Sequence, residues 1–160
     1  MDILNLFDHK QYIPQVANWL YEEFINGIRA GISLEAVVNA LGKRHRDTIP
    51  LTYIGVVNDE CVGTASLVRN DLKSRDDLTP WLAALYVREA DRGRGYARQL
   101  IDHVITSAKA LGFQKLYLRT ETAADYYRML GWKKIYETID EFDLFTEVFE
   151  KEIGDQEPSQ

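Results

Sequence analysis

The stretch Ala90–Ile105, "ADRGRGYARQLIDHVI", decides the fold, because a glycine turn meets a helical pattern within it. Gly93 and Gly95 flank an arginine, and apolar residues at helical spacing follow at once. Directly before this stretch, Trp81–Val87 ("WLAALYV") is almost entirely apolar, which is typical of a strand buried on both faces. The sequence therefore predicts a buried strand, a glycine turn and a long helix in direct succession.

The predicted helix carries its apolar residues at spacings of three and four, and Gly112 ends it. A further strand is expected at residues 114–120, "QKLYLRT". Strand, helix and strand together form a βαβ unit from Trp81 to Thr120, for which a right-handed crossover is expected. The apolar positions of the helix are Ala97, Leu100, Ile101, Val104, Ile105, Ala108 and Leu111.

The glycine turn is suited to hold a phosphate. The first N–H groups of a helix have no partner within it, and the helix dipole makes this end partly positive. Glycines let the backbone approach an anion closely, and Arg92, Arg94 and Arg98 add charge nearby. The pattern G-x-x-x-x-G-K-[ST] is absent, and G-x-G-x-x-G fails because the sixth position from Gly93 is Arg98. A turn that only starts the helix remains the alternative.

The flanking sequence extends the βαβ unit into the order β-α-α-β-β-β-α-β-α-β-β. An early strand (2–7), a helix (9–24) and a second helix capped by Ser33 precede a hairpin that turns at Asn58-Asp59. A short helix "AADYYRML" and a closing strand pair follow the unit. This order predicts an α/β fold with a mixed, mostly antiparallel sheet. We expect one domain over residues 1–151 and a disordered acidic tail at 152–160.

Composition narrows the class of protein. The chain has 160 residues, which suits one domain, and 46% of them are apolar, which is enough for a core. The net charge of −6 disfavours a nucleic-acid binder. No apolar run is long enough to span a membrane, and the N-terminus does not resemble a signal peptide. Cys61 is the single cysteine, so no internal disulfide can form, and we expect a cytoplasmic protein.

Several correctly spaced pieces resemble the GCN5-related N-acetyltransferase (GNAT) family. Arg92–Ala97, "RGRGYA", fits the family signature R/Q-x-x-G-x-G/A. The preceding "LYV", the helix that ends at "LGF" and the later "YYRMLGW" also match, so that the resemblance covers Pro80 to Lys134. It implies a GNAT-like fold whose βαβ core binds acyl-CoA.

The resemblance implies transfer of an acetyl group from acetyl-CoA to a primary amine by direct attack in a ternary complex. In the family the central strand bulges and splays from its neighbour, making a V-shaped slot. The pantetheine arm pairs with this strand, and the turn holds the pyrophosphate. A backbone N–H near Leu85 or Tyr86 would meet the thioester carbonyl. The residues implied to bind the cofactor are Leu85, Tyr86, Val87, Arg92, Gly93, Arg94, Gly95, Tyr96 and Ala97.

Tyr127 matches the tyrosine that protonates the departing thiolate in many family members. A phenol has a pKa of about 10, so it is a proton donor at neutral pH. Tyr126 points about 100° away on the same helix, so one of the two should face the core and the other the slot.

The base is not assigned from the sequence. Many members carry a glutamate on the central strand, where this chain has Ala83 and Ala84. A water chain is one candidate, and the acidic candidates are Glu121, Asp125, Glu22 and Glu23. No metal is expected, because His9, His45 and His103 lack metal-ligand spacing.

The acceptor amine stays open among a polyamine-like or aminoglycoside-like molecule, an amino acid and a protein amine, with a small molecule favoured over a protein. No nucleic-acid or membrane partner is expected. The C-terminal strands could pair in a homodimer, as is common in the family. Two alternatives remain: a non-catalytic acyl-CoA-binding sensor or partner subunit of the same fold, and a helix-pair interaction protein in which the glycines only form a turn.

Overall fold

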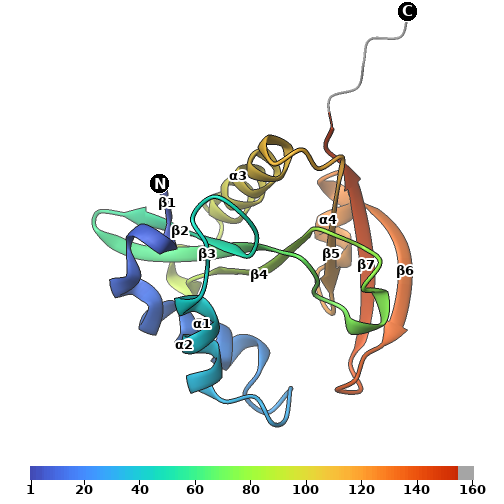
Figure 1. The fold of residues 1–160 in the computed structure, drawn as a ribbon, viewed down its shortest axis with the longest axis horizontal. Helices are drawn as coiled ribbons and strands as arrows, with labels where there is room; N and C mark the ends of the chain where they lie inside the picture. Colours follow the sequence, from blue (N-terminus) through green and yellow to red (C-terminus); the bar gives the residue numbers. More distant parts are fainter. Residues whose placement is uncertain (155–160) are drawn as a thin grey trace, which may run out of the picture.

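The computed structural model describes residues 1–154 and contains a seven-stranded sheet in the order β1-β2-β3-β4-β5-β7-β6. Within these residues β4 and β5 are the parallel pair, and the other neighbouring strands are antiparallel. Figure 1 shows α1 and α2 on one side of the β1–β4 half and α3 on the other. The predicted mixed, mostly antiparallel α/β fold is confirmed.

The order of helices and strands matches the prediction throughout residues 1–154. The first strand is shorter than expected, because a 3-10 turn begins at Leu6, whose side chain is buried. The elements are β1 (Asp2–Asn5), α1 (Ile13–Phe24), α2 (Leu34–Gly42), β2 (Leu51–Val57), β3 (Glu60–Val68), β4 (Trp81–Val87), α3 (Tyr96–Ala110), β5 (Lys115–Thr120), α4 (Ala124–Met129), β6 (Lys133–Ile139) and β7 (Phe145–Glu152).

Two apolar clusters hold the helices on opposite faces of the sheet. On one face α3 packs its buried stripe, which includes Leu100 and Val104, against Leu67 of β3 and Leu82 of β4. On the other face α1 and α2 pack against alternate residues of β2, including Ile54. Because successive strand residues point to opposite faces, the same strands supply both clusters. The helices thereby fix β2, β3 and β4 as a rigid platform.

The C-terminus departs from the expected tail. We expected disorder from Glu152, but β7 continues through Glu152, and Ile153 is buried in the cluster beneath α3. The backbone N–H groups of Ile153 and Gly154 both donate to the carbonyl of Gln114. The rest of the expected tail, residues 155–160, lies outside the described residues. In residues 1–154 no helix has the length and apolarity needed to cross a membrane.

Gly63 allows β3 to lie close to β4, which gives a stability prediction. A Cβ at Gly63 would lie 2.9 Å from the Tyr86 carbonyl oxygen, so Gly63→Ala must push the two strands apart. We expect it to lower the free energy of unfolding in urea by about 1–3 kcal/mol. Gly42→Ala is the matched control, because a Cβ there meets nothing within 4 Å, and it should be neutral or stabilise α2 by up to about 1 kcal/mol. Equal effects of the two changes would contradict the close approach.

Candidate active site

A bulge interrupts β4 in the middle of the sheet. Ser66 of β3 faces Ala83, and Thr64 faces Tyr86, so one residue of β3 spans two residues of β4, Ala84 and Leu85. Ala84 has a φ of 54°, which is strained for a residue with a side chain. This is the bulge that the family resemblance implied.

Beyond the bulge, β4 separates from β5. The register between them contains a single pair, Trp81 with Tyr117, and the Tyr117 N–H also donates to the carbonyl of Pro80. Figure 1 shows the two strands running apart from this point. The β4 edge from Leu82 to Val87 therefore has no strand partner on the β5 side within residues 1–154. The implied V-shaped slot is confirmed, and its open edge can accept an extended ligand as an added strand.

The slot also changes how β4 is buried. The sequence predicted a strand buried on both faces, and Trp81, Leu82 and Val87 are buried. The stretch 83–86 is only half-buried, because it borders the slot and a cavity. The prediction was wrong for this stretch, since an apolar run does not reveal where a neighbouring strand departs.

The glycine turn presents open backbone at the start of α3. Gly93 and Gly95 have φ of 79° and 81°, a conformation that favours glycine, and a Cβ at either would meet nothing within 4 Å. Gly95 caps α3 without any side-chain hydrogen bond to the first helical N–H groups. The first N–H groups of α3 therefore have no side-chain cap, and the turn before them is open, as an anion-binding helix start requires.

The arginines of the turn have different surroundings. Arg92 donates through Nε to the Val87 carbonyl at 2.9 Å and lies over the Tyr86 ring, so its side chain holds the turn against β4. Arg94 and Arg98 are exposed and form no ion pair with other residues of the described part. They are the cations that can reach a ligand at the start of α3.

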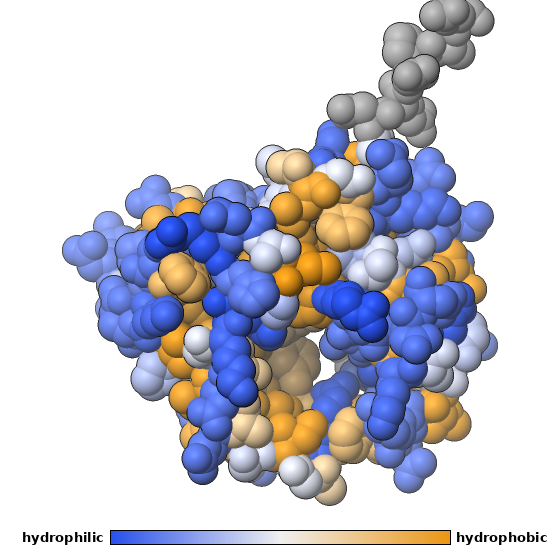
Figure 2. All heavy atoms as spheres, in the orientation of Figure 1, coloured by the Kyte–Doolittle hydropathy of each residue, from blue (hydrophilic) through white to orange (hydrophobic). Residues whose placement is uncertain are grey.

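A cavity of about 1060 Å³ lies on the α1–α2 side of the slot. Figure 2 shows a hollow between the two halves of the molecule, with hydrophobic side chains inside and hydrophilic ones at its sides. The walls of this cavity come from α1, the α1–α2 loop, the end of β3 and the β6–β7 turn. Strands β4 and β5 form its floor. The lining includes Glu23, Phe24, Arg29, Arg44, Ser66, Arg69, Asp71, Ala83, Ala84, Leu85, Arg119, Glu121, Tyr127, Glu141 and Leu144.

Tyr127 lies where the cavity meets the core. It is 8% exposed, its ring contacts Trp132 and Phe149, and it lines the cavity. Burial, with a smaller contribution from Tyr126, raises the pKa of the Tyr127 phenol to about 12. The phenol therefore remains protonated at neutral pH and can only donate its proton.

Tyr126 differs from its neighbour, but not as predicted: instead of one phenol in the core and one at the slot, Tyr127 both packs in the core and lines the cavity. Tyr126 is half-buried and is absent from the cavity lining. Burial raises its pKa, and Arg98 and Asp102 of α3 act on the same phenol. Tyr126 thus faces α3, while Tyr127 faces the cavity. Helix α4 thus carries two neighbouring phenols, and only that of Tyr127 borders the candidate site.

Most of the carboxylates considered as the base either lie outside the cavity or already bind other residues of the chain. Asp125 is fully exposed and pairs with Arg128, and Glu22 accepts a hydrogen bond from Asn26 outside the lining. Glu121 lines the cavity, but its two oxygens bind Arg29 at 2.9 Å and the Thr146 hydroxyl at 3.1 Å. Glu23 lines the cavity as an exposed residue.

Sequence reasoning missed Asp71, which lies in the loop between β3 and β4. Asp71 is half-buried and lines the cavity. Within the described part of the chain its carboxylate accepts no hydrogen bond and forms no ion pair. Burial raises the pKa of this carboxyl to about 6, although the charges of Arg119, Arg29 and Arg44 act to lower it. The sequence did contain one sign that this loop is anchored: the neighbouring Leu72 is an apolar residue among charged ones. Its side chain is 1% exposed in the structure.

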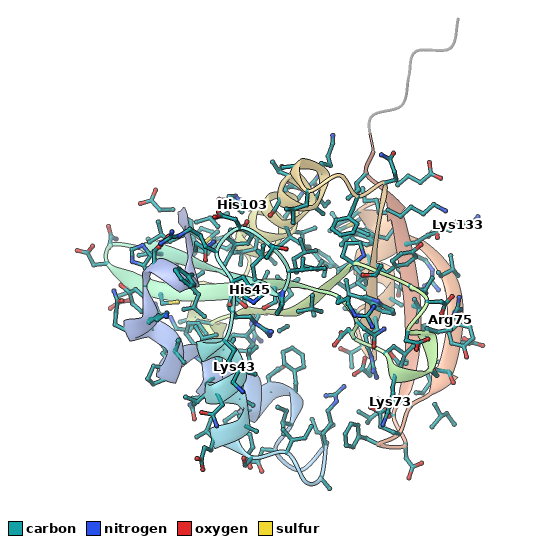
Figure 3. All side chains as sticks on the ribbon, viewed as in Figure 1. Lys43, His45, Lys73, Arg75, His103 and Lys133 are labelled. Carbon is teal, nitrogen blue, oxygen red and sulfur yellow. The ribbon has the colours of Figure 1, made fainter. Side chains whose placement is uncertain are left out.

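Four further polar side chains are absent from the cavity lining. Figure 3 labels Lys43 and His45 after α2 in one half of the molecule, and Lys73 and Arg75 before β4 in the other. His103 lies on α3 and contacts the Tyr53 ring, away from the cavity lining. Residues 1–154 contain no cluster of three or more His, Cys, Asp or Glu placed to hold a metal.

Comparison with known proteins identifies relatives of this fold. The family model described as the Acetyltransferase (GNAT) family matches residues 13–132. No curated protein sequence matches the chain. The matched range includes the bulged strand, the glycine turn and Tyr127.

Solved structures share the fold at low sequence identity. An aminoglycoside 6'-N-acetyltransferase in complex with coenzyme A is 17% identical, with a TM-score of 0.77 over 99% of this chain and 100% of that one. The ribosomal-protein-alanine N-acetyltransferase of Brucella melitensis is 19% identical, with a TM-score of 0.74 over 95% and 99%. The N-acetylglutamate synthase of Neisseria gonorrhoeae, bound to coenzyme A and N-acetyl-glutamate, is 17% identical, with a TM-score of 0.69 over 96% and 35%.

The raised pKa of Asp71 predicts a pH-dependent effect on stability. The pKa rises from 3.8 to about 6 on folding, so the folded state favours the protonated carboxyl. The associated stability is present below about pH 4 and is lost as the pH rises through about 6. At about 1.4 kcal/mol per pKa unit, the loss is at most about 3 kcal/mol.

Asp71→Asn removes this charge, so we expect its melting temperature to exceed that of the unmodified protein by more at pH 7 than at pH 4. Thermal unfolding at both pH values measures the difference. Asp77→Asn is the matched control, because Asp77 lies in the same loop, is 60% exposed and pairs with Arg75. A melting temperature of Asp71→Asn that falls at pH 7 would contradict the burial of an unpaired carboxylate.

Proposed function

Because the chain belongs to the GNAT acetyltransferase family, we propose that it transfers an acetyl group from acetyl-CoA to a primary amine by direct attack in a ternary complex. One observation carries the proposal: the free edge of β4 joins an open glycine turn at one end to a cavity containing Tyr127 at the other. A long ligand along this edge would have its phosphates at the turn and its reactive end at the cavity.

The residues of the turn fit the diphosphate of CoA. The turn at Gly93 and Gly95 is open, and no side chain caps the positive end of the 15-residue helix α3 that follows it. Arg94 and Arg98 supply charge without an internal partner, while Arg92 supports the turn from behind. The stretch Leu85–Val87 offers backbone groups to the amides of the pantetheine arm.

The bulge has a catalytic consequence in this proposal. Ala84 and Leu85 have no register partner in β3, so the backbone turns out of the ladder where the thioester would lie. The N–H of Leu85 or Tyr86 then donates to the carbonyl oxygen as negative charge develops on it. A well-placed donor of this kind contributes about 3–4 kcal/mol to stabilising the transition state. Holding both substrates at reacting distance contributes further.

Tyr127 acts as the general acid. When the C–S bond breaks, the thiolate sulfur takes the phenolic proton, and the phenol recovers a proton from solvent. Its raised pKa of about 12 keeps it protonated until that moment. The acceptor amine enters from the cavity, on the α1–α2 side of the slot.

A small-molecule amine suits this cavity better than a protein surface. The cavity has a volume of about 1060 Å³, and its wall carries both acidic and basic side chains. The similar structures include enzymes named for an aminoglycoside, a ribosomal protein and glutamate, so the fold accepts different amines. We place the reaction in the cytoplasm, where the buried Cys61 would stay reduced.

A homodimer through the C-terminal strands remains a prediction. β6 is the edge strand of the sheet, and Ile139 and Phe145, which face each other in the β6–β7 register, are 65% and 51% exposed. Exposed apolar residues at an unpaired edge favour association with another strand.

Binding of acetyl-CoA is the first test. Both CoA and acetyl-CoA, but not ATP, should raise the melting temperature, since a ligand at 100 times its dissociation constant adds about 2.7 kcal/mol to the folded state. Arg94→Ala should weaken CoA binding roughly tenfold by removing a charged hydrogen bond. Arg46→Ala is the matched control, because Arg46 pairs with Asp8 outside the slot. No stabilisation by either CoA species would contradict the proposal and leave the glycines as a simple turn.

Tyr127→Phe separates an enzyme from a non-catalytic acyl-CoA sensor. With acetyl-CoA and a panel of kanamycin, spermidine, lysine and an alanyl peptide, we expect product formation by the unmodified protein. Tyr127→Phe should lower kcat by about 100-fold or more while CoA affinity stays unchanged. Tyr126→Phe should keep its rate, because Tyr126 faces α3. Acetyl-CoA binding without acetylation of any amine would favour the sensor, and an unchanged rate would remove Tyr127 as the acid.

A further inference from the structure

A hydrogen bond to the backbone carbonyl of Asp71 fixes this residue beside the cavity. Arg119 of β5 donates through Nη1 to the Asp71 carbonyl at 3.2 Å, so the segment after β3 is fixed across the start of β4. Arg119 lies two residues beyond Tyr117, which pairs with Trp81, and is therefore level with Ala83. Ala83 and Ala84 carry only methyl groups at the floor. Between Leu82 and Leu85, β4 therefore contributes only small side chains to the cavity lining.

The Asp71 carboxylate is available to a ligand. The other carboxylates of the lining are either occupied, as Glu121 is by Arg29 and Thr146, or exposed to bulk water, as Glu23 and Glu141 are. Asp71 is half-buried, and no hydrogen bond or ion pair within residues 1–154 uses its oxygens. A partly desolvated carboxylate without an internal partner gains most from an amine that binds beside it.

We propose that Asp71 is the general base of this site and accepts the proton of the acceptor amine. The inference rests on the proposed acetyl transfer and assigns a role that this proposal leaves open. The amine nitrogen, bound in its neutral form, attacks the thioester carbon. As the N–C bond forms, one N–H proton passes to an Asp71 oxygen; as the C–S bond breaks, the sulfur takes the Tyr127 proton. Asp71 then releases its proton to solvent, and Tyr127 regains one.

Burial, opposed by the charges that face Asp71, explains its basicity. Arg119 faces it from β5, Arg29 from the α1–α2 loop and Arg44 from the segment after α2, while Glu121 opposes them. Burial outweighs the three arginines and raises the pKa of the carboxyl to about 6. At neutral pH the group is therefore mostly ionised, yet it binds a proton more strongly than an ordinary aspartate. A base is most effective when its pKa lies near the working pH.

The test compares two small nucleophiles at saturating acetyl-CoA, using the full chain. Both nucleophiles must lose an N–H proton as the N–C bond forms. Hydroxylamine is a much weaker base than ethanolamine, so its nitrogen, once bonded to carbon, is more acidic and can lose that proton to water without Asp71. The variants are Asp71→Asn and the control Asp77→Asn, which changes an exposed carboxylate of the same loop. Melting temperature and acetyl-CoA affinity are measured for each variant, so that a damaged fold is recognised.

We expect Asp71→Asn to lower the rate with ethanolamine by about 100-fold or more and the rate with hydroxylamine only a few-fold. The pH profile adds a signature that a structural role would not give. Protonation of ethanolamine lowers log rate with unit slope towards acid, and Asp71 adds a further unit of slope below about pH 6. Asp71→Asn should remove that extra slope, Asp71→Glu should restore part of the rate, and Asp77→Asn should match the unmodified protein.

Three results would overturn the assignment of the base while leaving acetyl transfer intact: equal losses with both nucleophiles, no loss with ethanolamine, or an extra slope that persists in Asp71→Asn. A different result marks failure of the proposed function. If the unmodified protein binds acetyl-CoA but acetylates neither these two nucleophiles nor any amine of the panel above, transfer itself is absent, and the role of Asp71 falls with it.

Discussion

The departure of β4 from β5 is the constraint on which the candidate site depends. Parallel strands in a sheet normally pair along their length, but here the register holds one pair, Trp81 with Tyr117. The bulge at Ala84 turns β4 away from β5 and twists it further. Unpaired strand edges cost stability when they are buried, so the gap favours a ligand that can supply the missing hydrogen bonds.

Arg119 keeps the two halves at this separation. Its side chain is 8% exposed and reaches Asp140 in the β6–β7 turn, the Thr146 hydroxyl of β7 and the Asp71 carbonyl after β3. One guanidinium thus ties β5 and the C-terminal hairpin to the loop that leads into β4. Because its donors point in a fixed fork, the geometry of these contacts is well defined. The cavity wall is therefore rigid on the side where Asp71 lies.

Local patterns in the sequence predicted the fold, but they could not predict features of the site that depend on tertiary contacts. The glycine turn, the stripe of α3 and the hairpin at Asn58-Asp59 each express a local rule, and each has its expected place. Tyr127 could be singled out as the candidate acid only through the family resemblance, because phenols on core helices are common. Asp71 was missed, since its surroundings come from Arg119, Arg29 and Arg44, which are distant in sequence. No local rule marks a loop carboxylate that becomes desolvated only when separate elements meet over it.

In the proposed reaction, one physical cause suits Tyr127 to act as an acid and Asp71 to act as a base. Burial disfavours the charged form of both Tyr127 and Asp71, and raises both pKa values. For a phenol, a rise to about 12 makes ionisation rarer, so the group can only donate. For a carboxyl, a rise to about 6 stops short of neutral pH, so the group stays ionised but accepts a proton more readily. Two groups whose pKa values lie on opposite sides of neutrality can move protons in opposite directions. Their positions on α4 and on the β3–β4 loop place them on different walls of one cavity, as a reaction that removes one proton and supplies another requires.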